Sequence, residues 1–291
     1  MANNPSKAII GVSLSGNTIL CGKVHNGKLV KSISKKIYSK GSEEEILTDL
    51  IGVISEVFND DVTGIGIGVP SLVDVQKGIV YNVQKIPAWR EVHLKDILEN
   101  QFGVKVYVNN DANCFAIGEK YFGNAKDYEN VIGLIIGTGV GAGIIFKGHL
   151  YSGTNCGAGE LGSLPYRDYD FEHYCSKSYF ELKYGMKFEL LLKRALKKDK
   201  IALAIFEQYG LDLGNLIKTI LYTTDPEIII LGGTIAKAFP FFETTMLNRV
   251  KTFIYKHSLK KLKIIPSQQS ETAIFGAVAL FFDAQNITLK K

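Results

Sequence analysis

Short apolar stretches alternate along the chain with longer segments in which apolar residues recur every three or four positions. The stretches Ala8–Leu14, Thr18–Val24 and Leu29–Ile37 each predict a strand. Asn26-Gly27 separates the last two and favours a type I′ hairpin turn, because both residues tolerate positive φ. Ser42, followed by three glutamates, predicts a capped helix start. Three strands and a helix therefore open the chain.

The same alternation continues to the end of the sequence. The expected strands are Gly64–Val69, Val104–Val108, Asn130–Ile136, Gly143–Phe146, Glu227–Leu231 and Leu262–Ile265. The expected helices are Leu94–Gln101, Ala112–Phe122, Phe180–Tyr184, Phe188–Lys197, Ile201–Tyr222, Phe241–Tyr255 and Ile274–Asp283. Strands that alternate with helices predict α/β layers with mixed sheets. A looser repeat of the opening pattern after residue 129 indicates two related halves.

Composition and length narrow the class of protein. The 291 residues are 46% hydrophobic and 22% charged, which favours two globular domains. No apolar stretch reaches the roughly 18 residues of a membrane span, and the N-terminus lacks a signal-peptide pattern, so we expect a cytoplasmic protein. The four scattered cysteines exclude a disulfide framework, and the net charge of +5 favours solvated basic faces over nucleic-acid binding.

The segment Asn109–Asn113 holds the strongest candidate for chemistry. It joins a predicted strand to a predicted helix, and ligands of α/β sheets bind beyond the carboxyl ends of strands. Asp111 is therefore placed where a carboxylate could accept a hydroxyl proton. Asp also commonly caps a helix, and the position alone does not decide between these two roles.

A glycine-rich turn, Ile136–Gly143, lies between two apolar strands. Alternating glycines let a backbone approach phosphate oxygens with its amide N–H groups. The turn lacks the Gly-Lys-Ser/Thr of a Walker loop, and a strand follows it where a dinucleotide motif has a helix. A tight hairpin without a ligand is the alternative.

Three further segments are candidates for binding. Gly232-Gly233 follows a buried strand and could pass close to an adenosine or simply start a helix. Glu160 lies in a glycine-flanked loop, and Glu181 is a second acid further along. Two convergent carboxylates suit a polyhydroxylated sugar, whereas either acid alone is more typical of a protein surface.

In this order, the segments resemble the ROK family of bacterial sugar kinases and related repressors, over nearly the whole chain. Asn110-Asp111-Ala112-Asn113 is similar to the family's catalytic segment and Gly137–Gly141 to its second phosphate loop. The other segments that carry the resemblance are Gly66–Pro70, Ile86–Trp89, Gly159–Gly162, Leu231–Gly233 and Gly276-Ala277.

The resemblance implies a two-domain actin-like ATPase (ribonuclease H-like) fold with an interdomain cleft. It places a sugar-side domain at residues 1–118 plus about 276–291 and a nucleotide-side domain at 119–275. It implies ATP-dependent phosphorylation of a hexose or amino-hexose with Mg²⁺, a homodimer, and Asp111 as general base. The implied sugar ligands are Ser71, Asn110, Asp111, Glu160 and Glu181; the implied nucleotide ligands are Ser15, Gly16, Asn17, Gly137, Thr138, Gly139, Gly141, Gly232 and Gly233.

The chain departs from the family pattern at the first phosphate motif, at the zinc site and at Ser71, which stands where the family has the Gly of a Pro-Gly turn that contacts sugar. The family's first phosphate motif reads Asp-Ile-Gly-Gly-Thr-Lys, whereas Ser13 begins the matching segment here, and a neutral Ser holds magnesium poorly. The family's zinc site loses its His at Ser163 and its cysteines except for Cys175, which with His173 cannot make a four-ligand site. We therefore expect no zinc.

Two other functions remain open within the family. A catalytically impaired sugar sensor is favoured by Ser13 and the other departures. A DNA-binding repressor would carry an N-terminal helix-turn-helix, and since the first expected strand begins by Ala8, we expect no such module and no nucleic-acid partner.

Overall fold

The computed structural model describes residues 8–83 and 85–285. They form two compact units. Unit 1 takes its described residues from 1–127, 149–158 and 269–291, and unit 2 comprises residues 128–148 and 159–268. Compared with the domain boundaries expected from the sequence, residues 119–127, 149–158 and 269–275 group with the first unit.

Unit 1 is built on a five-stranded sheet in the order β3-β2-β1-β4-β8. Its strands are β1 (Ala8–Ser15), β2 (Thr18–His25), β3 (Lys28–Lys36), β4 (Val62–Val69) and β8 (Lys105–Asn110). β1, β4 and β8 run parallel, while β2 and β3 pair antiparallel. Asn26 and Gly27 have φ of 52° and 71°, as the I′ turn requires. The carboxyl ends of three parallel strands therefore meet at one edge of this sheet.

The helices of unit 1 are α1 (Glu43–Ser55), α2 (Leu94–Phe102), α3 (Asp111–Tyr121) and α10 (Thr272–Ala284). α1 starts with the expected cap, in which Glu45 N–H donates to Ser42 Oγ and Ser42 N–H to the Glu45 carboxylate. α10 lies directly on the sheet, because Gly11 and Gly66 leave no side chain between them. A Cβ on Gly66 would lie 1.8 Å from the carbonyl oxygen of Ala277.

Short strands complete unit 1. β5 (Leu72–Asp74), β6 (Ile79–Tyr81) and β7 (Glu91–Val92) form an antiparallel meander, and β11 (His149–Tyr151) contacts α3. The sequence analysis missed all four, since strands of two or three residues carry no readable periodicity. The loop after β6 is held by Ile86 and Trp89, which are both fully buried.

Unit 2 repeats the strand arrangement of unit 1. β9 (Val131–Ile136) pairs antiparallel with β10 (Val140–Phe146) and parallel with β14 (Ile228–Gly232), which in turn pairs parallel with β15 (Lys263–Pro266). A two-stranded hairpin, β12 (Pro165–Tyr166) and β13 (Tyr169–Asp170), stands apart from this sheet. The related halves expected from the sequence are visible in this repeated order.

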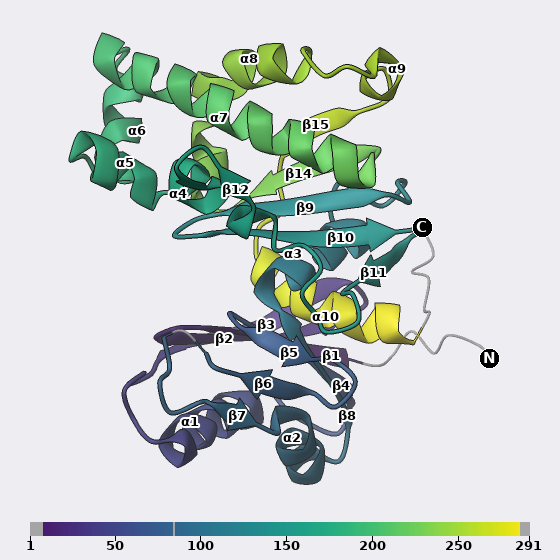
Figure 1. Ribbon diagram of the computed structural model, residues 1–291. Helices are drawn as coiled ribbons and strands as arrows, with labels where there is room; N and C mark the ends of the chain where they lie inside the picture. The colour runs from purple at the N-terminus through teal and green to yellow at the C-terminus, as the bar shows by residue number, and fades with distance from the viewer. Residues whose placement is uncertain (1–7, 84, 286–291) are drawn as a thin grey trace. The chain divides into compact units, whose positions relative to one another are not determined.

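The helices of unit 2 surround one large core. They are α4 (Phe171–Cys175), α5 (Ser178–Tyr184), α6 (Phe188–Leu196), α7 (Lys200–Thr224), α8 (Phe239–Val250) and α9 (Lys256–Leu259). α7 packs along α8, and the core joins both helices to β9 and β14 (Figure 1). The predicted helix Phe241–Tyr255 was wrong at both ends: Pro240 stands in the first turn, where proline is tolerated, and the helix stops at Val250.

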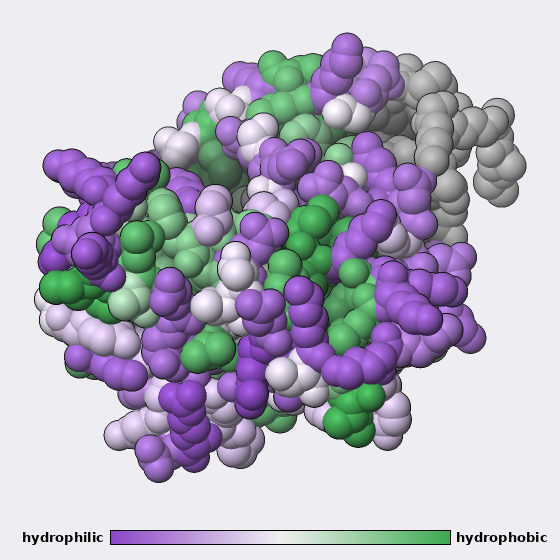
Figure 2. Space-filling model, turned by 90° about the horizontal axis from the view of Figure 1, so that it is seen from above, coloured by the Kyte–Doolittle hydropathy of each residue, from purple (hydrophilic) through white to green (hydrophobic). Residues whose placement is uncertain are grey.

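Hydrophobic and hydrophilic residues alternate on the face of the molecule drawn in Figure 2. Figure 2 shows one face on which hydrophobic residues form separate patches between hydrophilic ones. No helix among the described residues combines the length and apolar character needed to cross a membrane.

Candidate functional site

The parallel edge of unit 1 brings the first group of candidate residues together. Ser13 pairs with Gly68, and Gly68 pairs with Asn109, so the three lie in one row across β1, β4 and β8. Two strand spacings separate Ser13 from Asn109, about 10 Å. The first glycine turn and the Asn110-Asp111 segment therefore lie at the same edge of one sheet.

Asn110, and not Asp111, caps α3. The Asn110 side-chain oxygen accepts from the Ala112 N–H at 2.8 Å, with the Asn110 backbone extended. Asp111 is the first residue of the helix proper and is exposed at the N-terminal end of the helix. The capping role that the sequence left open for Asp111 thus belongs to its neighbour.

Ser71 and Asn110 are in direct contact. Asn110 Nδ2 donates to the Ser71 carbonyl oxygen at 3.2 Å, and the Ser71 hydroxyl donates to the Tyr81 carbonyl oxygen. Both residues are therefore fixed at the end of β4 and β8. Two predicted sugar ligands, Ser71 and Asn110, therefore lie side by side, and Asp111 is the next residue after Asn110.

The predicted residues of the first glycine turn line a pocket. A cavity of about 410 Å³ in unit 1 is lined by Ser15, Gly16, Asn17, Ser39 and Lys85. Ser15 Oγ donates to the Thr18 carbonyl oxygen at 3.3 Å, and the Asn17 carbonyl oxygen accepts from the Ile37 N–H at 3.0 Å. The turn is closed by its own bonds. Lys85 was not identified from the sequence, since nothing in its local pattern marks it.

In unit 2, the second glycine turn presents amide groups. Gly137 N–H donates to the Gly139 carbonyl oxygen at 2.9 Å and closes the turn. Within the described residues, the N–H groups of Thr138 and Gly139 donate no hydrogen bond. Gly141 lies further on, inside β10 opposite Ile135. Two adjacent amide donors without protein acceptors suit an oxyanion such as phosphate.

The segment from α4 to α5 holds this turn at three points. The Glu172 carboxylate accepts from the Val140 N–H at 2.8 Å. Lys177 N–H donates to the Gly137 carbonyl oxygen at 2.7 Å, and Ser178 Oγ to that of Thr138 at 3.3 Å. Glu172 is a residue that sequence reasoning missed, because its role depends on a partner 32 positions away.

The Glu160 loop packs beside the same turn. A Cβ on Gly159 would lie 2.0 Å from the Ala142 carbonyl oxygen, and one on Gly162 would lie 2.4 Å from that of Val140. Glycine at these positions lets the loop lie on β10. Burial, and then the negative charge of Glu172, raises the pKa of Glu160 above its usual value.

The remaining predicted residues of unit 2 are the Gly232-Gly233 pair after β14 and Glu181 on α5. Gly233, with φ of 80°, packs on the last residue of β9: its Cβ would lie 2.2 Å from the Ile136 carbonyl oxygen. Gly232 and Gly233 therefore meet the second glycine turn. Glu181 is exposed on α5, one turn beyond Ser178, so it shares the short helix that contacts the turn.

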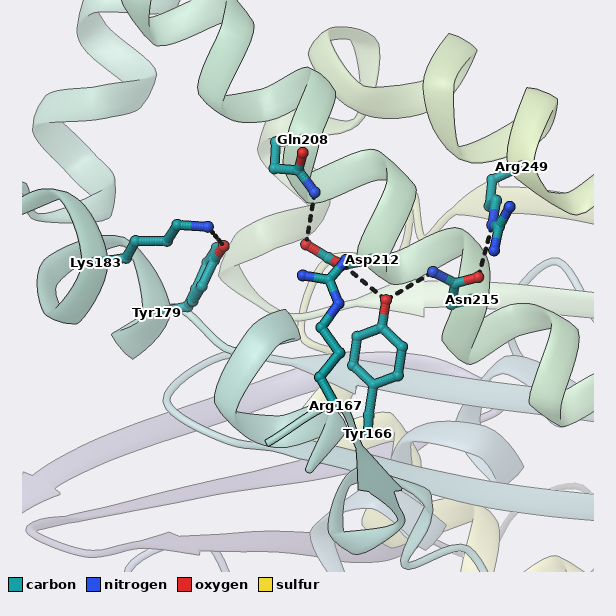
Figure 3. Close-up of polar contacts among 8 residues, drawn as sticks. All are labelled: Tyr166, Arg167, Tyr179, Lys183, Gln208, Asp212, Asn215 and Arg249. Carbon is teal, nitrogen blue, oxygen red and sulfur yellow. Dashed lines mark hydrogen bonds and ion pairs between the residues drawn. The ribbon is translucent and has the colours of Figure 1, made fainter. Parts of the chain in front are cut away.

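A buried polar network anchors the hairpin that leads into α4 (Figure 3). The fully buried Asp212 of α7 accepts from Tyr166 Oη at 2.9 Å and pairs with Arg167 at 2.6 Å. Gln208 Nε2 donates to Asp212 at 3.2 Å, and Asn215 Nδ2 to Tyr166 Oη at 2.7 Å. Tyr166 also stacks on Phe171, the first residue of α4. The network thereby fixes the helix that carries Glu172.

Metal-ligating side chains are not gathered in the described part of the chain. It contains no group of three or more His, Cys, Asp and Glu residues placed to hold an ion. Burial raises the pKa of the Cys175 thiol well above its usual value, and His173 stacks on Tyr169. The expectation that zinc is absent stays a prediction.

The chain is similar to known proteins over most of its length. A glucokinase of Thermotoga maritima is 26% identical in an alignment that covers 95% of this chain and 98% of that protein. A xylose repressor of Bacillus subtilis is 29% identical in an alignment that covers 72% of this chain and 58% of that protein.

The fold has known counterparts too. The crystal structure of a ROK family glucokinase from Streptomyces griseus, in complex with glucose and AMPPNP, superposes with a TM-score of 0.77 at 23% identity, over 94% of this chain and 98% of that one. This likeness confirms the actin-like ATPase fold expected from the sequence. The sequence pattern that defines the ROK family matches residues 9–284, and the chain belongs to that family.

Proposed function

We propose that this protein is an ATP-dependent sugar kinase that phosphorylates a hydroxyl of a hexose or amino-hexose, most simply the 6-hydroxyl. The observation that carries the proposal is the position of Asp111. It is the first residue of α3, directly after the capping residue Asn110, at the strand edge that also holds the first glycine turn. Membership of a family that includes glucokinases supports the same reading.

In the proposed reaction, Asp111 accepts the proton of the sugar hydroxyl as its oxygen attacks the γ-phosphate of ATP. Asn110 and Ser71, which contact each other, bind neighbouring hydroxyls, as do Glu160 and Glu181 of unit 2. The amides of Thr138 and Gly139 donate to phosphate oxygens. Gly232 and Gly233 leave room for the adenosine because they carry no side chain.

The residues present suit a magnesium ion that arrives on the nucleotide. Mg²⁺ keeps several waters and binds through substrate phosphates with one or two carboxylates, so it needs no complete protein cage. Asp111 is an acid at this edge, and Ser13, two strands away at the end of β1, offers only a neutral hydroxyl. When bound, the ion would neutralise charge on the transferring phosphate.

The test is a coupled assay of ADP release with a panel of hexoses and amino-hexoses. Sugar-dependent turnover that Asp111→Asn abolishes, in a variant that folds normally, is the expected result. Turnover that survives this substitution would remove Asp111 from its role.

A sugar sensor without turnover is the second candidate, and Ser13 favours it. The family's Asp is replaced there by a side chain that holds magnesium poorly. One relative, similar over 72% of this chain, is named a xylose repressor, which is a regulator. Binding of a hexose, seen by calorimetry, without sugar-dependent ADP release would support this reading.

We propose a homodimer and a cytoplasmic location on the same family resemblance. Large hydrophobic side chains are exposed on the helices of unit 2, among them Leu182, Leu196 and Ile201 at 63–70%. Light scattering on the purified chain tests the dimer.

A further inference from the structure

The loop that follows β6 presents a lysine to the first glycine turn. Within this loop Val83 N–H donates to the Trp89 carbonyl oxygen at 3.1 Å and Ile86 N–H to that of Val83 at 3.0 Å. Trp89 N–H donates to the Ile86 carbonyl oxygen at 3.0 Å, and Ile86 and Trp89 are fully buried. Lys85 directly precedes the fully buried Ile86, which anchors the backbone on that side of it.

The Lys85 side chain lies over Gly16. A Cβ at Gly16 would be 2.4 Å from Lys85 Cδ and 2.8 Å from Lys85 Cβ. Gly16 has no need of positive φ, so glycine is required here for the close approach of the lysine. The aliphatic stem is thereby packed on the turn, which leaves the ammonium group at its end near the residues that line the pocket.

The lining of this pocket is made of donors. It offers the hydroxyl of Ser39, the amide of Asn17 and the Lys85 ammonium group, and no carboxylate is found among the lining residues that the structure describes. Thr18 Oγ1 donates to Asn17 Oδ1 at 3.2 Å, which leaves the Asn17 Nδ2 as a donor to a ligand. Such a set selects an anion with several acceptor oxygens.

Lys85 differs from Lys23 and Lys35 of unit 1 in its partners. Lys23 pairs with Asp61 at 2.6 Å and Lys35 with Asp49 at 2.7 Å. Within the described residues Lys85 makes no ion pair or hydrogen bond. Its charge is therefore uncompensated, in a pocket of about 410 Å³.

We propose that Lys85 is a further, cationic ligand of the phosphate group that the first glycine turn is expected to bind, acting with the donors of Asn17 and Ser39 in the same pocket. The inference rests on the proposed function in one respect: the phosphate is taken to belong to the nucleotide. Lys85 then supplies, from a loop about 70 positions later in the sequence, positive charge at a turn whose own residues are all neutral.

Calorimetric titration of the full chain with tripolyphosphate tests the site without depending on catalysis. Lys85→Met should weaken binding about tenfold, and Lys85→Arg should retain most of it. Lys95→Met is the matched control, because the Lys95 side chain covers Gly78 in the same way: a Cβ there would be 2.2 Å from Lys95 Cβ. This control should bind like the unmodified protein.

Three results would overturn the site: no binding of tripolyphosphate by the unmodified chain, unchanged binding by Lys85→Met, or equal losses in Lys85→Met and Lys95→Met. Circular dichroism checks folding, and Lys85→Gln replaces the Met variant if that one misfolds. The two proposals fail separately. Binding lost in Lys85→Met without turnover on any sugar contradicts the kinase, whereas turnover with an unchanged KM for ATP in that variant contradicts the site.

Discussion

The two glycine turns occupy equivalent places in the two units, yet they are supported by opposite charges. Each follows a strand that pairs antiparallel with the next strand and parallel with a later one, β1 in unit 1 and β9 in unit 2. The turn at Gly16 is covered by a lysine, and the turn at Gly137–Gly139 is held by the Glu172 carboxylate.

In the proposed nucleotide site, this difference separates two ways of preparing a backbone for phosphate. In unit 2, Glu172 and the α4–α5 segment occupy the Val140 amide and the turn's carbonyl groups, so the remaining amides of Thr138 and Gly139 are left to bind an anion. In unit 1, the turn closes on itself, and charge comes from a separate loop. In unit 2 the neighbouring residues fix the position of the turn, whereas in unit 1 a lysine adds positive charge beside the turn.

The largest expected effect is on kcat, and it comes from Asp111, which lies in neither glycine turn. Asp111→Asn should lower kcat by about 10²–10⁴-fold, because the general base is lost while Asn110 still caps α3. The measurement is steady-state ADP release with the best hexose of the panel. Asn110→Ala is the contrasting variant. It should cost about 1 kcal/mol of stability through the lost cap. Similar kcat values for Asp111→Asn and the unmodified chain would contradict the assignment.

The support of the second turn begins in the polar network around the buried Asp212 (Figure 3). Asp212→Ala should lower the free energy of unfolding by about 1–2 kcal/mol, since Tyr166 Oη loses its acceptor, whereas Arg167, which is 42% exposed, keeps its charge in water. Urea denaturation followed by circular dichroism measures this change. Asp168→Ala, an exposed acid in the turn of the same hairpin, should change stability by less than about 0.5 kcal/mol. Equal effects of the two would show that the network does not anchor the hairpin.

The carboxylate at the second turn can be tested by its hydrogen bond. Glu172→Ala should raise the KM for ATP about fivefold, because the Val140 N–H loses its acceptor and the turn loses a fixed point. Glu172→Gln keeps an acceptor oxygen and should restore most of the affinity, with kcat little changed in both. Glu207→Ala, an exposed acid on α7, is the neutral control. If Gln behaves like Ala, the charge and not the hydrogen bond is what the turn needs.

The smallest effect concerns pH. The charge of Glu172 helps to hold the pKa of Glu160 above its usual value, which makes this carboxylate protonate at a higher pH. A sugar ligand that accepts hydrogen bonds must be ionised, so the acidic limb of kcat/KM for the sugar should start at a higher pH than usual. Glu172→Gln removes the repulsion, the smaller of the two causes after burial, and should move that limb to lower pH. A limb that stays in place or moves up would contradict the coupling.

Much of the fold could be predicted because its signals are local. The apolar runs of β1, β2 and β14, the Asn26-Gly27 turn and the Ser42 cap all act over a few residues, and each was found where the pattern indicated. The position of Asp111 was predicted for the same reason, since a strand and a helix flank it. Whether Asp111 or Asn110 capped the helix needed the backbone conformation.

The parts that escaped prediction depend on distant partners. Glu172 meets Val140 32 positions away, and Asp212 meets Tyr166 46 positions away, so no local pattern could mark either acid. The meander of β5, β6 and β7 was missed because its strands are too short to show alternation. Lys85 was missed because its neighbour in space, Gly16, belongs to another strand pair.

The placement of α10 on β1 and β4 determines when unit 1 can be completed during synthesis. Ile9 and Val24 at the start of the chain share an apolar cluster with Ile274, Val278 and Phe281 near its end. A ribosome must therefore translate all of unit 2 before the last helix of unit 1 exists, and a nascent chain that stops short of residue 272 leaves the first sheet uncovered on one face. The unit whose strands emerge first is the last to close.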